Sequence, residues 1–477
     1  MNKPVQGSLL HLSLTEAAAA VKDGSITSVA LTTAALEAFS RVDKVINSSI
    51  WLESAVALEA AEALDKKRES GAKLGPLHGI PLAHKDMYYK AGKLSTCGSS
   101  IRKDFRPAYT ATVIERLEEA GSVTLGGLNM AEFAQNPTGH NQHYGHCRNP
   151  WHPDYCTGGS SSGSGAAVAA RLVYGALGSD TGGSIRLPAS ICGVTGIKPT
   201  QTRVSRHGVM PLSFSTDNVG PLTQTARDAA RFMAVIAGHD PKDPTSSHEP
   251  VADYEAALTG DLSGMIIGVP TNYFFDGIDA DVQAAFDQVV LVLKERGAVI
   301  IPVTIPHIDA IATYGGILSR VEGGTIHGEW MRRRPQDYAV HLSGRLYPSQ
   351  GIPAVYYVEG LARRGPILKA VGKEVFGLCH AFITPTLRVT VPTLLSTDID
   401  AGTPGAIELF QDMSINTRPI NYLGLPSVSV PCGLDPNGLP IGFQVQGRPF
   451  AEARILAIAD AYQRDTDWHR RLPPNVS

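Results

Sequence analysis

The sequence lacks the features that mark several large classes of protein. It has no run of about 18 apolar residues, so it predicts no membrane-spanning helix. Its first residues do not combine a basic flank with a long apolar core, so we expect no signal peptide. The formal net charge is −3, and no stretch is dense in Lys and Arg. We therefore expect a protein that binds neither membranes nor nucleic acids.

Cysteine is also scarce, and its spacing carries little information. The six cysteines are scattered and form no C-x-x-C pair, which favours reduced thiols and a cytoplasmic location. The sequence has no internal repeat and no Pro/Ser-rich linker. Hydrophobic residues make up 43% of its 477 residues and charged residues 18%, as in globular proteins. The whole chain, 1–477, is predicted to be one large domain.

Helical and strand-like segments alternate along the chain. Residues 1–70 have a helical pattern, with Ser13 as a start signal and Gly24 as a stop signal. Residues 75–240 mix short apolar strands with helices, and residues 306–375 are mainly helical. Such alternation predicts an α/β fold in which the strands are largely parallel. The region 306–375 is interpreted as a helical insertion.

The segment SDTGGSIR, residues 179–186, is the first candidate for chemistry. A glycine-rich turn leaves backbone N–H groups free to bind a developing oxyanion, because glycine has no side chain to block close approach. Ser184 closes this turn, so its hydroxyl is a candidate nucleophile. The candidate oxyanion donors are the N–H groups of Thr181, Gly182, Gly183 and Ser184. On this segment alone, a glycine-rich hairpin without chemistry is the favoured interpretation.

A serine nucleophile needs a base, and the sequence offers a lysine for that role. No G-x-S-x-G motif precedes Ser184, which weakens the α/β-hydrolase interpretation. Lys85 follows the apolar strand GIPLA, and burial there would lower its pKa. An ion pair with Asp86 is the alternative. The segment 157–171 begins with the Gly/Ser composition of a linker, yet it ends in AAVAAR, a strong helix former.

Taken together, these motifs resemble the amidase signature family. The matching segments are GGSSSGSGAAVAA, SDTGGSIRLPAS and GVTGIKPT, and the similarity covers residues 10–240 densely. It returns near the end of the chain in INYLGLPSVSVPCG and GLPIGFQVQGRPFAE. The resemblance implies the amidase signature fold, a large mixed and mainly parallel β-sheet covered by helices on both faces. Residues 75–240 would be the signature core, and residues 306–375 the variable region that shapes the substrate pocket.

The resemblance also implies a Ser–Ser–Lys triad. Lys85 would be the base, Ser160 the bridging serine and Ser184 the nucleophile, with a cis peptide bond between Gly159 and Ser160. Ser184 would attack an amide carbonyl, form an acyl-enzyme and release an amine or ammonia and then a carboxylic acid. No metal or organic cofactor is implied. Supporting roles would fall to Gly159, Ser161, Asp180 and Arg186.

The substrate pocket is the least determined part of the sequence. Asn136 and Tyr144 are candidate wall residues, with loop packing as the alternative. The variable region adds Trp330, Tyr356 and Tyr357, for which core packing is the alternative. Its apolar, aromatic composition suggests a neutral aryl or alkyl amide, and anilides, carbamates and esters are open to the same chemistry. His84, next to Lys85, replaces an aliphatic residue of relatives, and a packing role is favoured.

A cluster of histidines resembles a metal-binding motif. His140, His143, His146 and Cys147 lie close together, with Cys156 further on. The three-residue spacing places no pair at i, i+4 on one helical face, so the sequence argues against zinc.

Three types of family member fit these residues. The first is a stand-alone amidase. The second is the A subunit of the glutamine-dependent tRNA amidotransferase, but DYAVHLSGRLYPS does not align with that subunit's glutamine-binding segment. The third is an inactive binding module, disfavoured because all three triad residues are present. The stand-alone enzyme is favoured. The predicted partner is a small amide substrate, with a second copy of the chain as the one protein partner considered.

Overall fold

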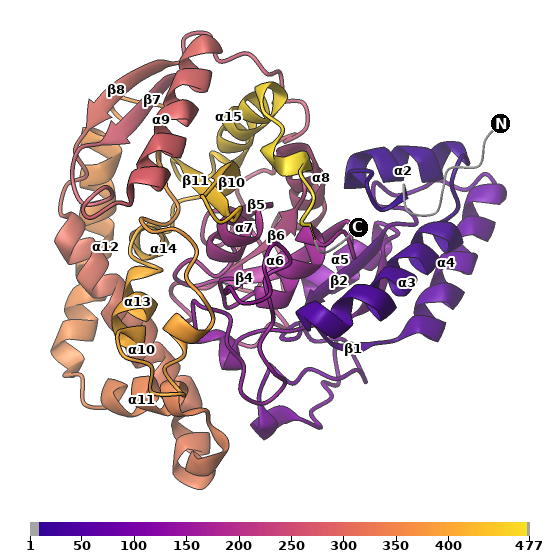
Figure 1. Ribbon diagram of the computed structural model, residues 1–477, viewed down its shortest axis with the longest axis horizontal. Helices are drawn as coiled ribbons and strands as arrows, with labels where there is room; N and C mark the ends of the chain where they lie inside the picture. Colours follow the sequence, from indigo (N-terminus) through magenta and orange to yellow (C-terminus); the bar gives the residue numbers. More distant parts are fainter. Residues whose placement is uncertain (1–8, 475–477) are drawn as a thin grey trace.

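A single mixed sheet organises the chain. The computed structural model describes residues 9–474, and in these residues eleven strands join one sheet in the order β1-β3-β2-β4-β6-β5-β10-β11-β9-β7-β8 (Figure 1). The strands are β1 Ser49–Leu52, β2 Pro81–Lys85, β3 Val123–Leu128, β4 Gly175–Asp180, β5 Thr195–Lys198, β6 Asn218–Thr223, β7 Ile266–Pro270, β8 Val299–Val303, β9 Ala381–Pro385, β10 Ser427–Leu434 and β11 Pro440–Gly447.

Strand direction differs between the flanks and the centre of this sheet. Four neighbouring pairs are parallel, β3–β2, β2–β4, β9–β7 and β7–β8. The other six pairs are antiparallel. The α/β class and the mixed sheet are confirmed, but the expectation of mainly parallel strands is wrong. At β10–β11 only the turn 435–439 joins the strands, and so short a connection allows antiparallel pairing alone.

Helices cover both faces of the sheet, as expected. Neighbouring residues of a strand point to opposite faces. In β5, Gly196 packs against Ala189 of α7, whereas Thr195 accepts a hydrogen bond from Gln463 of α15 at 2.9 Å. The helices are α2 Leu14–Asp23, α3 Ser28–Ile46, α4 Ser54–Glu69, α5 Thr112–Glu119, α6 Ser162–Ala169, α7 Arg186–Cys192, α8 Ala226–Ile236, α9 Ala280–Glu295, α10 Ile308–Arg333, α11 Val340–Ser349, α12 Ala354–Glu374, α13 Ala406–Asp412, α14 Arg418–Leu423 and α15 Glu452–Asp465.

The N-terminal helices follow their sequence signals. Ser13 forms a capping box with Glu16, and Gly24 ends α2 in the left-handed conformation at φ 82°. Residues 306–375 are mainly helical, through α10, α11 and α12, as predicted. All six cysteines are buried and unpaired. Within residues 9–474, no helix has both the length and the apolar character that crossing a bilayer would require.

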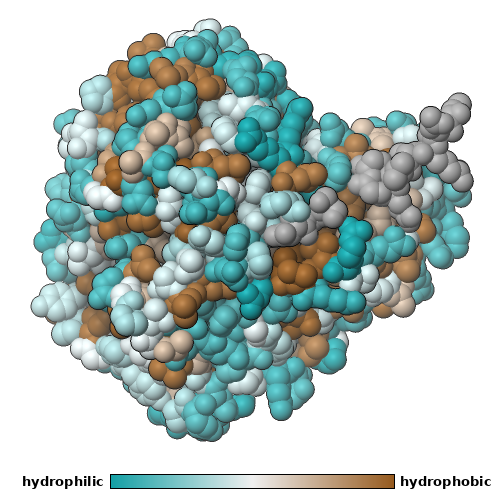
Figure 2. Space-filling view, viewed as in Figure 1, coloured by the Kyte–Doolittle hydropathy of each residue, from teal (hydrophilic) through white to brown (hydrophobic). Residues whose placement is uncertain are grey.

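One edge of the sheet carries an apolar surface. Strand β8 is an edge strand, and Val299 on it is 51% exposed. Leu291 of the adjacent helix α9 is 48% exposed. Figure 2 shows apolar side chains gathered over this part of the molecule, at the upper left of the view. An edge strand with apolar side chains is a surface on which another chain can pack.

Candidate active site

Lys85 lies where two parallel strands end. β2 and β4 are parallel neighbours, so their carboxyl ends meet at the same edge of the sheet. Lys85 ends β2, and its Nζ donates hydrogen bonds to Ser160 Oγ at 2.7 Å and to Ser179 Oγ at 2.8 Å. The side chain is buried. Ser179, in β4, is a contact that the sequence interpretation missed, although it opens the quoted motif SDTGGS.

The environment of Lys85 favours its neutral form. Burial lowers the pKa of Lys85 from 10.5 to about 7, against the opposing influence of Asp180 and Asp217. A substantial fraction of this amine is therefore unprotonated near neutral pH and able to accept a proton. Asp86 does not pair with Lys85, because its carboxylate accepts hydrogen bonds from Trp51 Nε1 at 2.9 Å and from the Thr96 N–H at 2.8 Å.

The segment around Ser160 is held against the nucleophile turn. The peptide bond between Gly159 and Ser160 is cis, as the resemblance predicted. Gly159 has no room for a side chain, since a Cβ there would lie 2.5 Å from the carbonyl oxygen of Asn136. The N–H of Ser161 donates to the carbonyl of Ser184 at 3.3 Å, so the two motifs touch directly. Ser161 Oγ hydrogen-bonds to the backbone of Ser179.

A buried ion pair fixes the turn that contains Ser184. Asp180 Oδ1 accepts the N–H of Gly183 at 2.8 Å, and Asp180 Oδ2 accepts Nε of Arg186 at 3.1 Å. Burial raises the pKa of Asp180, but Arg186 outweighs this effect and the pKa falls to about 2. Arg186 also donates to Asn421 Oδ1 at 2.6 Å and to Gln444 Oε1 at 2.9 Å. The turn is thus tied to the C-terminal strands.

These contacts revise the set of candidate oxyanion donors. The N–H of Gly183 already donates to Asp180, so it is not free to bind an oxyanion. The amides of Thr181, Gly182 and Ser184 remain as candidates. Gly183 has φ 134°, and a Cβ there would lie 2.2 Å from Thr417 Oγ1, so this position requires glycine for conformation and for space. Thr417 also donates to the carbonyl of Gly182 at 2.6 Å.

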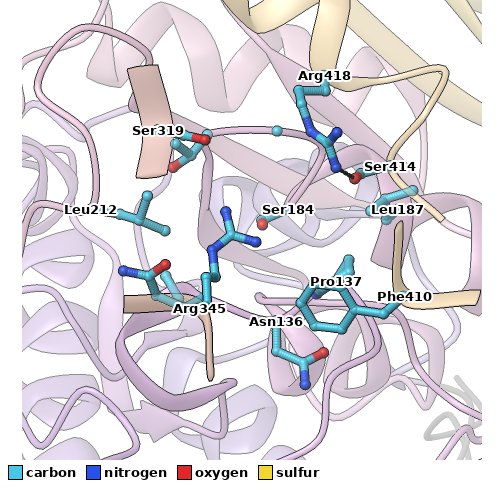
Figure 3. Close-up of a pocket in the computed structure, with 14 residues that line it drawn as sticks. Asn136, Pro137, Ser184, Leu187, Leu212, Ser319, Arg345, Phe410, Ser414 and Arg418 are labelled. Atoms are coloured by element: carbon cyan, nitrogen blue, oxygen red, sulfur yellow. Dashed lines mark hydrogen bonds between the residues drawn. The ribbon is translucent and has the colours of Figure 1, made fainter. Parts of the chain in front are cut away.

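A cavity that is open to solvent lies over Ser184 (Figure 3). Among the residues that the structure describes, the Ser184 hydroxyl makes no hydrogen bond, which leaves it free to meet a ligand. The cavity is lined by Ala134, Gln135, Asn136, Pro137, Thr181, Gly182, Ser184, Leu187, Leu212, Ser319, Arg345, Phe410, Ser414 and Arg418. Asn136 is therefore placed in the wall of this cavity.

The other four predicted pocket residues lie outside this lining. Tyr144 packs in the loop above Asn47, which donates to its carbonyl at 3.0 Å. Trp330 stacks on Phe133, with 5.3 Å between ring centroids. Tyr357 donates to Glu322 Oε1 at 3.0 Å, and Tyr356 is 50% exposed on the outer surface of α12. The helices of the variable region turn these aromatic rings into the core or toward solvent, so the pocket does not contain them.

Two arginines take the place of the predicted aromatic residues. Arg345 in α11 and Arg418 at the start of α14 line the cavity. Figure 3 shows both guanidinium groups turned toward the space around Ser184. Sequence reasoning missed both. Arg345 stands inside the very segment SGRLYPS that could not be aligned, and nothing in the sequence shows which way that helix faces.

His84 has a structural environment. It is buried in β2, and its Nδ1 accepts a hydrogen bond from the Leu177 N–H at 3.3 Å. Burial lowers the pKa of His84 to about 3, with a smaller effect of Lys90 in the same direction, so the ring stays neutral. This geometry agrees with the favoured packing role.

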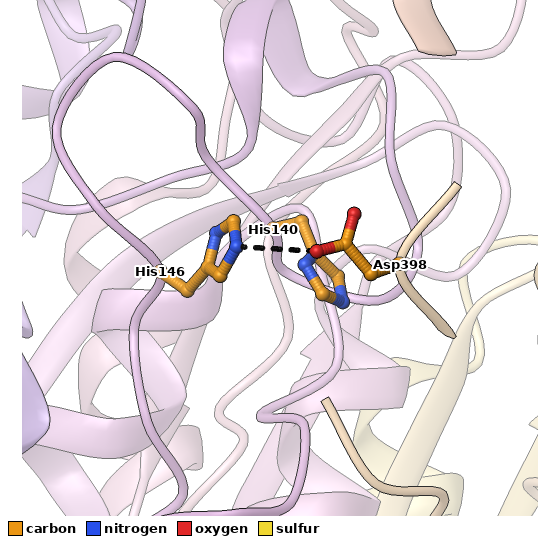
Figure 4. A group of neighbouring side chains, drawn as sticks. All are labelled: His140, His146 and Asp398. Atoms are coloured by element: carbon orange, nitrogen blue, oxygen red, sulfur yellow. Dashed lines mark ion pairs between the residues drawn. The ribbon is translucent and has the colours of Figure 1, made fainter. Parts of the chain in front are cut away.

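The loop that contains His140, His143 and His146 contributes to a cluster of side chains that the sequence did not predict. His140, His146 and Asp398 come together from distant segments, with donor atoms within 4.8 Å of one another (Figure 4). His143 is elsewhere and contacts Glu132 Oε1 at 2.9 Å. Cys147 and Cys156 are buried separately in the core.

Hydrogen bonding sets the protonation of these two rings. Thr397 Oγ1 donates to Thr393 O at 3.0 Å, so it accepts from His140 Nε2 at 2.9 Å and leaves a lone pair on His140 Nδ1. His146 Nδ1 accepts the Asn141 N–H at 3.1 Å, so its proton sits on Nε2, 3.9 Å from Asp398. Only the His140 ring therefore offers a lone pair to a metal ion. For His146 to bind the same ion, its hydrogen bond with the Asn141 N–H would have to break.

Comparisons with known proteins identify the family of this chain. The amidase family model matches residues 30–456. The A subunit of the glutamyl-tRNA(Gln) amidotransferase of Chloroflexus aurantiacus is 40% identical over 98% of this chain and 99% of its own. A bacterial aryl acylamidase of the amidase signature family has a TM-score of 0.86 at 27% identity, covering 96% of each chain. The chain therefore belongs to the amidase signature family, whose members are amide hydrolases.

A further structural relative gives information about protein partners. It is described as an unexpected vestigial protein complex that reveals the evolutionary origins of an s-triazine catabolic enzyme. It is 32% identical, with a TM-score of 0.88, over 95% of this chain and 98% of its own. The prediction that limited partners to a small amide and a second copy of the chain is contradicted. One relative is by name a subunit of an amidotransferase, and the other is a component of a protein complex.

Proposed function

We propose that this chain is the catalytic subunit of a multi-subunit enzyme, of the type represented by the A subunit of the tRNA amidotransferase. In this role it hydrolyses a carboxamide whose far end carries a carboxylate, a class of compound that includes glutamine. The single observation that carries the proposal is the cavity that Ser184 shares with two arginines, on a segment that contacts the neighbour of Ser160, the serine bonded to Lys85. The 40% identity over nearly the whole chain supports the subunit type.

In the proposed mechanism, a proton relay activates Ser184. Neutral Lys85 takes a proton from Ser160 while Ser160 takes one from Ser184. Ser184 Oγ then bonds to the amide carbon, and the amides of the turn bind the negative oxygen. The C–N bond breaks as the relay returns the proton to nitrogen, so that ammonia leaves. Water, activated by the same relay, releases the carboxylic acid from Ser184.

The charge of the cavity replaces the expectation of a neutral aryl or alkyl substrate. Two guanidinium groups beside the nucleophile favour a ligand with a negative group, because guanidinium and carboxylate match in charge and in planar geometry. The predicted aromatic wall residues lie elsewhere, which removes the main reason for expecting an aryl group.

The test is amide hydrolysis by the full chain, with trapping of the acyl-enzyme. We expect ammonia release from glutamine or a related carboxylated amide, and a mass increase on Ser184 equal to the acyl group. Ser184→Ala should abolish both signals. The control is Ser162→Ala, a serine of the same Gly/Ser motif whose Oγ contacts the Asn129 carbonyl at 3.4 Å. An adduct on another residue, or full turnover by Ser184→Ala, would refute the proposal.

A second candidate is a catabolic amide hydrolase that works in a protein complex. The observation that favours it is the TM-score of 0.88 to a protein described in connection with an s-triazine catabolic enzyme. Transfer of the released ammonia to glutamyl-tRNA in the presence of partner subunits separates the two candidates. The amidotransferase subunit supports this transfer, and the catabolic enzyme releases ammonia to solvent.

A further inference from the structure

The two arginines of the cavity have no acidic partner. Arg345 makes no hydrogen bond or ion pair with any residue in 9–474, and its Nε is buried without a partner. Arg418 donates only to the hydroxyl of Ser414. Burial, together with the neighbouring charges of Arg418 and Arg320, lowers the pKa of Arg345 to about 9. Arg345 therefore stays charged at neutral pH, at a cost that an anionic ligand would relieve.

No carboxylate belongs to the described lining of the cavity. Two acids, Asp217 and Glu322, are already engaged in hydrogen bonds. Asp217 accepts the N–H groups of Leu212 and Ser213, both at 2.9 Å. Glu322 accepts Ser215 Oγ at 2.6 Å and Tyr357 Oη at 3.0 Å. An ammonium group in this cavity would therefore meet two cations and no anion.

Neutral polar groups complete the wall. Gln135 lines the cavity and is buried, yet neither its Oε1 nor its Nε2 has a hydrogen-bond partner. A buried amide without partners is rare in folded proteins and marks a place where a ligand supplies them. Together, Gln135 and the arginines provide more donors than acceptors, which again suits a carboxylate.

We propose that Arg345 and Arg418 form an anion subsite, and that the substrate is the monoamide of a dicarboxylic acid without an ammonium group, bound in preference to glutamine. This rests on the proposed function, since Ser184 still cleaves the C–N bond of a carboxamide. The products are the dicarboxylate and ammonia, with water as the only co-reactant. The carboxylate pairs with the guanidinium groups while the carboxamide faces Ser184.

Binding to the full-length Ser184→Ala variant tests the subsite without turnover. Three probes of equal chain length separate the charges: glutaramate carries a carboxylate, glutamine adds an ammonium group, and pentanamide carries neither. By titration calorimetry we expect glutaramate to bind at least about tenfold more tightly than glutamine and than pentanamide, the factor for one lost charge-assisted contact. Equal or tighter binding of glutamine overturns the proposal, and so does equal binding of pentanamide.

Variants that remove the charge of one arginine test whether Arg345 and Arg418 form the subsite. Arg345→Gln and Arg418→Gln should each weaken glutaramate binding about tenfold and leave pentanamide binding within about twofold. Arg345→Lys, which keeps the charge, should recover part of the affinity if the Gln variant folds poorly. Arg333→Gln, an arginine on the exposed surface of α10, is the matched control and should change nothing. Unchanged glutaramate binding in both Gln variants overturns the assignment.

The two proposals fail in different ways. If wild-type protein forms no acyl adduct on Ser184 with any amide, the proposed function fails, whatever the binding order. If wild-type protein hydrolyses pentanamide as well as glutaramate, the function stands and the anion subsite is wrong. If it hydrolyses glutamine as well as glutaramate, the function stands and the preference against an ammonium group is wrong.

Discussion

The signature core and the variable helical region differ in how directly their sequences determine their sites. In residues 75–240, Lys85, Ser160 and the turn around Ser184 meet at one edge of the sheet. In residues 306–375, the three predicted aromatic residues turn away from the cavity and an unpredicted arginine lines it. In the core the backbone itself shapes the site, because Gly159 and Gly183 stand where no side chain would fit. In the variable region, the orientation of long helices decides which side chains face the substrate.

The largest expected difference in kcat/KM is between variants of two buried lysines of the core. Burial lowers the pKa of both Lys85 and Lys198 to about 7. Only Lys85 touches the serines, since Lys198 Nζ donates to the Pro199 carbonyl at 2.7 Å. Lys85→Met should reduce kcat/KM for amide hydrolysis by at least about 10³-fold, because Ser184 loses its base. A folded Lys198→Met that lost as much would contradict this assignment.

The next effect contrasts a buried arginine of the core with an exposed one of the variable region. Arg186→Met leaves the Asp180 carboxylate buried without its cation and should lower the free energy of unfolding by about 3–5 kcal/mol. Arg333→Met should change it by less than about 0.5 kcal/mol, because Arg333 is solvated. Urea denaturation of both variants measures the difference, and equal values would remove the contrast.

The dependence on pH follows from the Lys85 amine. Because the relay needs neutral Lys85, kcat/KM should rise about tenfold per pH unit below about 7 and level off above it. Stability should change in the same direction. The folded pKa is below the unfolded value of 10.5, so the contribution of Lys85 is full above 10.5 and is lost as pH falls through about 7. A flat rate profile from about pH 5.5 to 8 would exclude lysine as the base.

The smallest effect is expected from the aromatic residues of the variable region. Tyr356→Ala should alter KM by less than about twofold, because that side chain is half exposed outside the cavity. Phe410→Ala, which removes an aromatic ring from the cavity wall, should raise KM by about tenfold. Steady-state kinetics on one substrate measure KM for both variants. A larger increase in KM for Tyr356→Ala than for Phe410→Ala would contradict the placement of the substrate in this cavity.

The sequence predicted the parts of the molecule that depend on local signals. Caps at Ser13 and Gly24, the helical content of 306–375 and the motif residues of the core all have short-range signatures. The antiparallel centre of the sheet was missed because pairing between distant strands leaves no local mark, although the short turn 435–439 was available as a signal. Ser179, Arg345 and Arg418 were missed because their roles depend on contacts between segments far apart in the chain.

The network around Arg186 has a consequence for how the protein is made. Its partners Thr417, Asn421 and Gln444 follow the nucleophile turn by more than 200 residues. A ribosome therefore completes every triad residue long before the chain can hold Ser184 in place. A copy that ends before Thr417 contains the whole proposed triad and yet lacks all three of these contacts. We therefore expect hydrolytic activity only from chains that extend through these C-terminal segments.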